Sequence, residues 1–145
     1  MSLTLAIIKP DAVASGLAGK ILAHLQDQGF TVRALKMTRL GSQQAGAFYE
    51  VHRERPFYDS LVSFMTSGPV IPMVLEADDA VAALRQAIGA TDPTEADEGT
   101  IRQLYAESKE RNAIHASDSD ENASAEISFF FSRHERLGRP TIHGH

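Results

Sequence analysis

Cysteine is missing from the chain altogether, which excludes both a disulfide framework and a thiolate zinc site. No apolar stretch approaches the roughly 20 residues that a membrane-spanning helix needs. The apolar run "LTLAII" meets Lys9 and Pro10 at once, and it is too short for the core of a signal peptide. We therefore expect a cytoplasmic protein that has no membrane segment.

The glycine-rich loops that cradle phosphates are also missing. The stretch "GLAGK" at residues 16–20 contains glycine and lysine, but not at the G-x-x-x-x-G-K-[ST] spacing that wraps phosphate oxygens. No G-x-G-x-x-G occurs anywhere in the chain. A nucleotide site in this protein would therefore have to be built from side chains.

Positive charge is scarce, since the formal net charge is −5. Nucleic-acid binding depends on neutralising phosphates with Lys and Arg, so we expect no specific nucleic-acid partner. An RNA-binding module would carry aromatics in a basic pattern on its sheet, and that pattern is absent. At 145 residues, with 43% hydrophobic side chains, the chain is long enough for one globular domain with its own core.

Hydrophobic periodicity predicts the order of helices and strands. We expect one domain over residues 1–131 and a polar tail over residues 132–145. The expected fold is an α+β, ferredoxin-like sandwich with a four-stranded antiparallel sheet and helices on one face. The strands are expected at residues 3–11, 30–40, 68–76 and 126–131, and the helices at 16–28, 43–49, 57–65, 79–89 and shortly after residue 99.

His115 is the main candidate for chemistry, because it lies among small, polar and acidic residues in "RNAIHASDSDENASAEI". An imidazole can act as a nucleophile or proton acceptor near neutral pH. Ser117, Asp118 and Glu126 would orient the ring through one nitrogen and leave the other free. The alternative is a loop histidine that only helps to cap the following helix.

Two further groups of side chains favour a phosphorylated ligand. Guanidinium groups bind phosphate oxygens in a bidentate manner, and an exposed aromatic ring stacks on a nucleobase. For single residues, the alternatives are a solvated surface charge and ordinary core packing. The basic group comprises Lys9, Arg55, Arg85, Arg102 and Arg111, with Thr91 and Asn112 as neutral donors, and the aromatic group comprises Tyr49, Phe57 and Tyr58.

The segment "NAIHASD" resembles the N-x-x-H-G-S-D signature of the nucleoside diphosphate kinases. The resemblance covers nearly the whole chain, in the order found in that family. Its other segments are "IIKPDAV", "FYEVHRERPFY", "SGPVIPMVLE", "GATDP", "GTIR" and "AEISFFF".

The resemblance implies an enzyme that passes the γ-phosphoryl group of a nucleoside triphosphate to a diphosphate through a phosphohistidine at His115. It implies that Lys9 and Asn112 contact the sugar and phosphates and that Phe57 stacks on the base above Leu61. It also implies that Arg85, Thr91 and Arg102 grip the phosphates, with Tyr49 beside the transferred group. Ser117 and Glu126 would support the imidazole.

The same resemblance implies a magnesium ion held by phosphates and water instead of protein side chains, and a homo-oligomer: a dimer, tetramer or hexamer. The sequence departs from the family pattern at Ala116, where glycine is usual, and in the tail "SRHERLGRPTIHGH". Alanine at position 116 would be strained only if that residue had a positive φ. A noncatalytic regulator with the same fold is the remaining alternative, although His115, Lys9, Arg102 and Asn112 are all retained.

Overall fold

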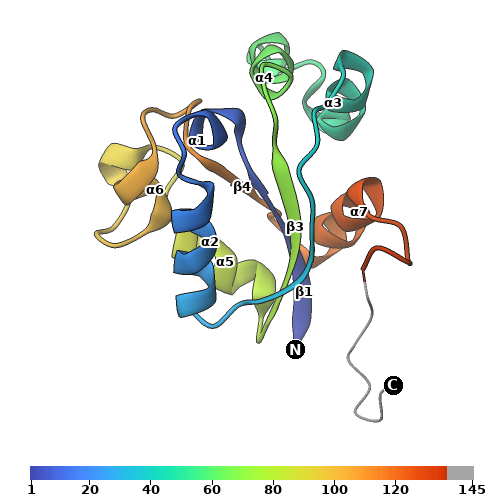
Figure 1. Cartoon of the computed structure of the whole chain (residues 1–145). Coiled ribbons are helices and arrows are strands. Elements are labelled where there is room, and N and C mark those ends of the chain that lie inside the picture. The colour runs from blue at the N-terminus through green and yellow to red at the C-terminus, as the bar shows by residue number, and fades with distance from the viewer. Residues whose placement is uncertain (137–145) are drawn as a thin grey trace.

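A computed structural model describes residues 1–136 of the chain. The chain alternates helices and strands throughout (Figure 1). The elements in order are β1 (Ser2–Ile8), α1 (Pro10–Ala14), α2 (Ala18–Asp27), β2 (Thr31–Leu35), α3 (Ser42–Phe48), a short 3-10 turn (Glu50–His52), α4 (Tyr58–Met65), β3 (Ile71–Ala77), α5 (Ala80–Ile88), a second 3-10 turn (Pro93–Glu95), α6 (Ile101–Tyr105), β4 (Ile114–Ala116) and α7 (Asp120–Phe130).

The strands form one antiparallel sheet of four strands in the order β2-β3-β1-β4. β1 is central, and Leu5 to Ile8 are buried on both faces of the sheet. Strands that are covered on both faces are continuously apolar, which is why "LTLAII" shows no alternation. The expected α+β sandwich with a four-stranded antiparallel sheet is confirmed.

Helices cover both faces of the sheet, so the expectation of helices on one face was wrong. On one face, α2 and α5 pack on a core that includes Ile21, Leu84 and Ile114. On the other face, α3, α4 and α7 enclose a second core that includes Phe64 and Ile127. Figure 1 shows α2 and α5 to one side of the strands and α3 and α7 to the other.

The segment "EISFFF" is helical, and the prediction of a strand there was wrong. Its residues 126–130 belong to α7, which runs from Asp120 to Phe130, and Phe131 follows the helix. Ser119 caps this helix, because its hydroxyl oxygen accepts a hydrogen bond from the Asn122 backbone N–H at 3.0 Å. Asp120 and Glu121 in the first turn further favour a helix. The fourth strand is instead β4, which has three residues and contains His115.

The expected tail begins directly after the last helix. Phe131 is buried, whereas the next four residues are exposed. Arg136 holds this segment to α7, since its guanidinium donates to the Phe131 carbonyl and to the Ser128 hydroxyl, at 3.3 and 3.2 Å. The rest of the expected tail, residues 137–145, lies outside the described residues. Within residues 1–136, no helix is both long enough and apolar enough to cross a bilayer.

Candidate active site

His115 lies in the middle of β4, at the edge of the sheet, opposite Ile7 of β1. Because side chains alternate along a strand, His115 points to the opposite face from its neighbours Ile114 and Ala116. Those two side chains belong to the core under α2 and α5. The imidazole therefore emerges on the side of α3 and α7, and 19% of its side chain is exposed.

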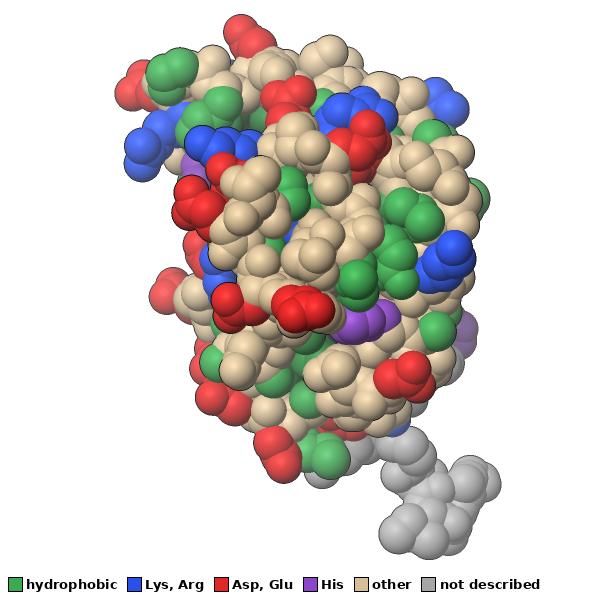
Figure 2. Space-filling view, turned by 90° about the vertical axis from the view of Figure 1, so that its left-hand side faces the viewer, with side chains coloured by type: hydrophobic (Ala, Val, Ile, Leu, Met, Phe, Trp, Pro, Cys, Tyr) green, Lys and Arg blue, Asp and Glu red, His purple; other side chains and the backbone are tan. Residues whose placement is uncertain are grey.

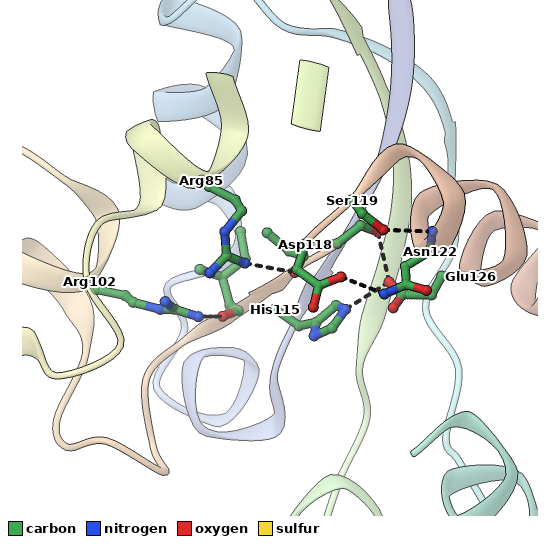
Figure 3. A network of polar contacts seen from close by, with 10 residues as sticks. Arg85, Arg102, His115, Asp118, Ser119, Asn122 and Glu126 are labelled. Carbon is green, nitrogen blue, oxygen red and sulfur yellow. Dashed lines mark hydrogen bonds and ion pairs between the residues drawn. The ribbon is translucent and has the colours of Figure 1, made fainter. Parts of the chain in front are cut away.

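Glu126 of α7 holds one nitrogen of this imidazole. His115 Nε2 lies 2.9 Å from Glu126 Oε1, and the Ser117 hydroxyl donates to the same oxygen at 2.7 Å. Because a carboxylate only accepts hydrogen bonds, this contact places the imidazole proton on Nε2 and leaves a lone pair on Nδ1. Within residues 1–136, Nδ1 makes no hydrogen bond to protein, and Figure 3 shows it turned away from Glu126.

Asp118 does not join this arrangement, although the sequence suggested it as a partner of the ring. Its Oδ1 accepts a hydrogen bond from Asn122 Nδ2 at 2.6 Å, within the first turn of α7. Asp118 therefore stabilises the start of the helix that carries Glu126, and the ring is oriented by Glu126 with Ser117.

Two arginines approach β4 from its open edge. Arg102 Nη2 donates to the Ile114 carbonyl at 2.8 Å, and Arg85 Nη1 lies 3.5 Å from the Ala116 carbonyl. In an antiparallel pair, only every second residue of a strand bonds to the neighbouring strand. In β4 and its flanks, Ala113 and Ser117 bond to the β1 side. The carbonyls of Ile114 and Ala116 therefore point to the open edge, where they can accept from the arginines. Figure 3 shows both guanidinium groups on the side of His115 opposite Glu126. Positive charge therefore flanks the imidazole.

Arg102 is buried, with 6% of its surface exposed. Burial, together with the charge of Arg85, lowers the pKa of Arg102 to about 10. The guanidinium is therefore still charged at neutral pH. Its Nε is buried and makes no hydrogen bond within the described residues.

Lys9 and Asn112 form a second polar pair beside the strand. Lys9 follows β1, and its Nζ donates to Asn112 Oδ1 at 2.8 Å. Both residues are buried. Burial, together with the charge of Arg102, lowers the pKa of Lys9 to about 8, against smaller raising effects of Asp11 and Glu110. The lysine is thus a desolvated cation that a ligand anion would stabilise.

A strained turn connects this pair to the strand. Ala113 has a φ of +74°, and the Ile114 backbone N–H donates back to the Asn112 carbonyl at 2.9 Å. This is the pattern of a classic γ-turn, which is rare and strained. Asp11 holds it in place, because its buried Oδ2 accepts from the Ala113 N–H at 3.0 Å. Neither the role of Asp11 nor the strain at Ala113 was predicted from the sequence, because no pattern of neighbouring residues indicates either.

Ala116 does not carry that strain. Within the described residues, positive φ outside glycine occurs at Asp79 and Ala113 alone. Ala116 lies in β4, where it pairs with Ala6. Its methyl group is 6% exposed and packs in the core. Alanine in place of the usual glycine therefore costs no backbone strain.

Aromatic rings of α3 and the turn after it border the imidazole. The Tyr49 and His115 ring centroids are 6.4 Å apart, and the Phe48 ring is closer, at 5.5 Å. Tyr49 is buried, and its hydroxyl has no hydrogen-bond partner within residues 1–136. Burial, with the charge of Glu126, raises the pKa of Tyr49, so the phenol stays neutral. Phe48 was not identified from the sequence, because an apolar ring has no group that marks it as reactive or ligand-binding.

The other candidate residues lie further from the imidazole. Phe57 precedes α4, is 48% exposed, and its ring lies 5.4 Å from that of His52. Leu61 is partly buried against the second core, and Thr91 is exposed in the loop before Pro93. Among the described residues, no hydrogen bond, ion pair or ring contact joins these three to His115.

Two of the expected basic residues lie elsewhere. Arg55 is exposed between α3 and α4. Arg111 pairs with Glu107 at 3.4 Å, and its guanidinium lies 5.7 Å from the Phe64 ring centre.

On the face drawn in Figure 2, acidic side chains are interspersed with the basic ones, and no continuous basic band crosses the described residues there. The convergent basic groups are therefore Lys9, Arg85 and Arg102.

Comparison with known proteins places this site in a family. A family model described as "Nucleoside diphosphate kinase" matches residues 2–136. The nucleoside diphosphate kinase of Chlorobium limicola is 56% identical over 135 residues, covering 93% of this chain and 96% of that protein. The one from Persephonella marina is 53% identical over 132 residues, covering 91% and 94%.

Solved structures agree with the sequence matches. The Aquifex aeolicus nucleoside diphosphate kinase superposes with a TM-score of 0.91 at 50% identity, covering 92% of this chain and 97% of that one. A Halobacterium salinarum nucleoside diphosphate kinase in complex with CDP gives a TM-score of 0.88 at 40% identity, covering 92% and 90%. The chain belongs to the nucleoside diphosphate kinase family, whose members are enzymes that transfer a phosphoryl group between nucleotides.

Proposed function

We propose that Nδ1 of His115 is the atom that carries the phosphoryl group in the nucleoside diphosphate kinase reaction of this chain. The observation that supports this most directly is the asymmetry of the ring. Nε2 is held by Glu126 at 2.9 Å, whereas Nδ1 has a lone pair and no protein partner within residues 1–136. A single imidazole then serves both half-reactions, which gives ping-pong kinetics.

In the first half-reaction, the Nδ1 lone pair attacks the γ-phosphorus of a nucleoside triphosphate. The N–P bond forms as the bond from phosphorus to the bridging oxygen breaks, and the nucleoside diphosphate leaves. In the second half-reaction, a terminal oxygen of an acceptor diphosphate attacks the same phosphorus, and the N–P bond breaks. The ring is cationic while it carries the phosphoryl group, and the Glu126 carboxylate stabilises that charge across the 2.9 Å contact.

The basic groups would position the phosphates. Arg102 and Arg85 contact the carbonyls of the residues before and after His115, and Thr91 would add a neutral donor. Phosphoryl transfer depends on in-line positioning and on spreading charge over the phosphate oxygens. Lys9 and Asn112, joined at 2.8 Å, would contact the sugar and the phosphates. Tyr49 keeps a neutral hydroxyl beside the transferred group.

The nucleobase would lie against the exposed ring of Phe57, with Leu61 one turn further along α4. The Leu61 backbone N–H donates to the Phe57 carbonyl at 2.9 Å, so both side chains lie on one face of this helix. Stacking uses the flat face that every base has. The site is therefore expected to accept purine and pyrimidine nucleotides, with ribose or deoxyribose.

Magnesium fits this site as a partner of the nucleotide. The nearest carboxylates are occupied, since Glu126 binds His115 and Ser117. No cluster of three or more His, Cys, Asp or Glu in residues 1–136 is arranged to hold a metal ion. The cationic donors Lys9, Arg85 and Arg102 suit phosphate oxygens, and Mg²⁺ commonly binds through substrate phosphates and water. When bound, magnesium neutralises charge on the phosphates.

The proposals for the domain bounds, the oligomeric state and the location of the chain rest on its membership of the family. We assign the catalytic domain to residues 1–131 and leave residues 132–145 as a tail. We propose that the protein is cytoplasmic. We also propose a homo-oligomer, because β2 is an edge strand, and the apolar side chains of Leu35, at its end, and Met37, just after it, are 45% and 60% exposed. Light scattering on the purified chain measures the number of subunits, and a monomer at working concentration would contradict this proposal.

A labelling experiment tests the role of His115. The purified chain is incubated with a nucleoside triphosphate labelled at the γ-phosphate, with magnesium and without an acceptor. We expect label on the protein that is stable in base and labile in acid. The variant His115→Ala should lose both the label and turnover, whereas His24→Ala, on α2, should keep both. An active His115→Ala variant would refute the assignment.

A further inference from the structure

Phe48 is the last residue of α3 and lies against the imidazole of His115. The two ring centroids are 5.5 Å apart and the ring planes meet at 72°. This edge-to-face geometry is favourable for aromatic pairs. The Phe48 ring also contacts Phe129 and Phe130 of α7, at 5.3 and 5.1 Å between centroids. Phe48 thus connects the imidazole to an aromatic surface formed by two helices.

The hydrogen bond to Glu126 does not fix the imidazole by itself. Nε2 lies close to the axis of the Cβ–Cγ bond, so the ring can turn about that bond while it keeps the contact at Nε2, and such a turn moves Nδ1. The ring of Phe48 contacts the imidazole at a different place and restricts this turn. Glu126 therefore determines which nitrogen is free, and Phe48 determines in which plane the free nitrogen lies.

Phe48 also affects which molecules can reach a phosphorylated His115. Water is a competitor in this reaction, because its oxygen can attack phosphorus, break the N–P bond and release inorganic phosphate. A benzene ring excludes water from the volume it fills. Only 19% of the His115 side chain is exposed, and Phe48 covers the flank that faces α3.

We propose that Phe48 is a positioning residue that keeps the plane of the His115 ring fixed and shields its phosphorylated form from hydrolysis. The proposal deepens the proposed function, since it rests on His115 carrying the phosphoryl group. Its consequence is specific: the aromatic ring at position 48 lengthens the lifetime of the phosphoenzyme when no acceptor diphosphate is present.

A role in packing alone makes a different prediction. Phe48 is partly exposed and packs beside the second core, so shortening it would lower the free energy of unfolding in either case. A packing residue would leave the hydrolysis rate of the phosphoenzyme unchanged. The lifetime of the label, measured well below the melting temperature, therefore separates the two roles.

The experiment compares Phe48→Leu, which keeps an apolar side chain but lacks the ring, with Phe48→Tyr, which keeps the ring. Each full-length variant is labelled with γ-labelled nucleoside triphosphate, freed of nucleotide, and followed for loss of label. We expect hydrolysis to be roughly three- to tenfold faster in Phe48→Leu than in the parent. The phosphoenzyme of Phe48→Tyr should have the same lifetime as that of the parent. Phe48→Met replaces Phe48→Leu if the latter does not fold.

The matched control is Phe129→Leu, because Phe129 contacts Phe48 and has no ring contact with His115 in the described residues. Its phosphoenzyme should decay at the parent rate. An unchanged lifetime in a folded Phe48→Leu variant would overturn the role of Phe48 and leave the role of His115 intact. If the parent takes up no acid-labile label, the proposed function fails, and the inference about Phe48 fails with it.

Discussion

Glu126 lies 11 residues after His115 in the chain, and its Oε1 is 2.9 Å from the imidazole Nε2. The contact joins the edge strand β4 to the helix that follows it, and both side chains are about four-fifths buried. A partly buried acceptor of this kind fixes the tautomer of a histidine. Glu126 therefore determines which ring nitrogen of His115 carries the proton.

The variant Glu126→Gln should slow phosphorylation of the protein by a nucleoside triphosphate. The amide is neutral, so it stabilises the cationic, phosphorylated ring less than a carboxylate does. A hydrogen bond to a charged group contributes about 1.5–3 kcal/mol and a neutral one about 0.5–1.5 kcal/mol. The difference of roughly 1–1.5 kcal/mol corresponds to about 5- to 10-fold in rate. Rapid-quench measurement of a single turnover gives this rate directly.

Ser117→Ala is the matched control for that variant. The Ser117 hydroxyl binds the same Glu126 oxygen at 2.7 Å, so its removal leaves the carboxylate and its contact with His115 in place. The rate should fall by less than in Glu126→Gln. Equal losses in the two variants would contradict a direct role for the carboxylate charge.

The pKa of Lys9 predicts a pH dependence of catalytic efficiency. Burial and the charge of Arg102 lower this pKa to about 8, so the lysine loses its positive charge as the pH rises through about 8. Because kcat/KM reports groups of the free enzyme, kcat/KM for a nucleoside triphosphate should fall above that pH. Arg102, with a pKa of about 10, should cause a separate fall at higher pH.

Lys9→Met removes the titrating group without removing the apolar stem. This variant should have a low kcat/KM that no longer changes near pH 8, while the fall near pH 10 persists. A profile that keeps its break near pH 8 in Lys9→Met would assign that break to another group.

Glu110 offers an independent check on the same lysine. Its carboxylate accepts a hydrogen bond from the Ser60 hydroxyl at 2.5 Å, and its negative charge raises the pKa of Lys9. Glu110→Gln should therefore move the break in kcat/KM to lower pH. Ser60→Ala keeps the negative charge and should shift the break less. A shift to higher pH in Glu110→Gln would contradict the sign of this interaction.

The apolar runs of the sequence were sufficient to predict most of the fold, but not its fourth strand. The strands at residues 2–8, 31–35 and 71–77 are apolar enough to be recognised locally. β4 has only three residues, Ile114 to Ala116, and a strand of that length has no readable periodicity. The aromatic run at residues 129–131 resembled a strand, because short apolar runs do not distinguish strand from helix. Ser119, Asp120 and Glu121 carried the correct signal for the helix.

The identity of the reactive histidine could be predicted, whereas the geometry around it could not. His115 stands among small and polar residues, and the resemblance to the family covers the same segment. The contacts of Asp11 with Ala113 and of Lys9 with Asn112 each join residues more than 100 positions apart. Such contacts depend on the pairing of β1 with β4, which no local pattern specifies.

The strained turn before His115 predicts different effects of glycine at two nearby positions. Ala113 has a φ of +74°, a conformation that costs a non-glycine residue roughly 1–2 kcal/mol. Glycine there removes the strain but adds about 0.5–1 kcal/mol of backbone entropy to the unfolded chain. Ala113 is also fully buried, so glycine loses a methyl group from the core there. The gain and the losses nearly cancel, and Ala113→Gly should change the free energy of unfolding by less than about 1 kcal/mol.

Ala116→Gly should lower the free energy of unfolding, although it restores the residue usual in the family. Ala116 lies in extended β4 without positive φ, so glycine gains nothing and costs about 0.5–1 kcal/mol of entropy. The buried methyl group is lost as well. Urea denaturation of the two variants measures both effects under the same conditions. If Ala116→Gly proved the more stable of the two, the strain would lie at position 116, and the alanine beside the reactive histidine would be a destabilising substitution after all.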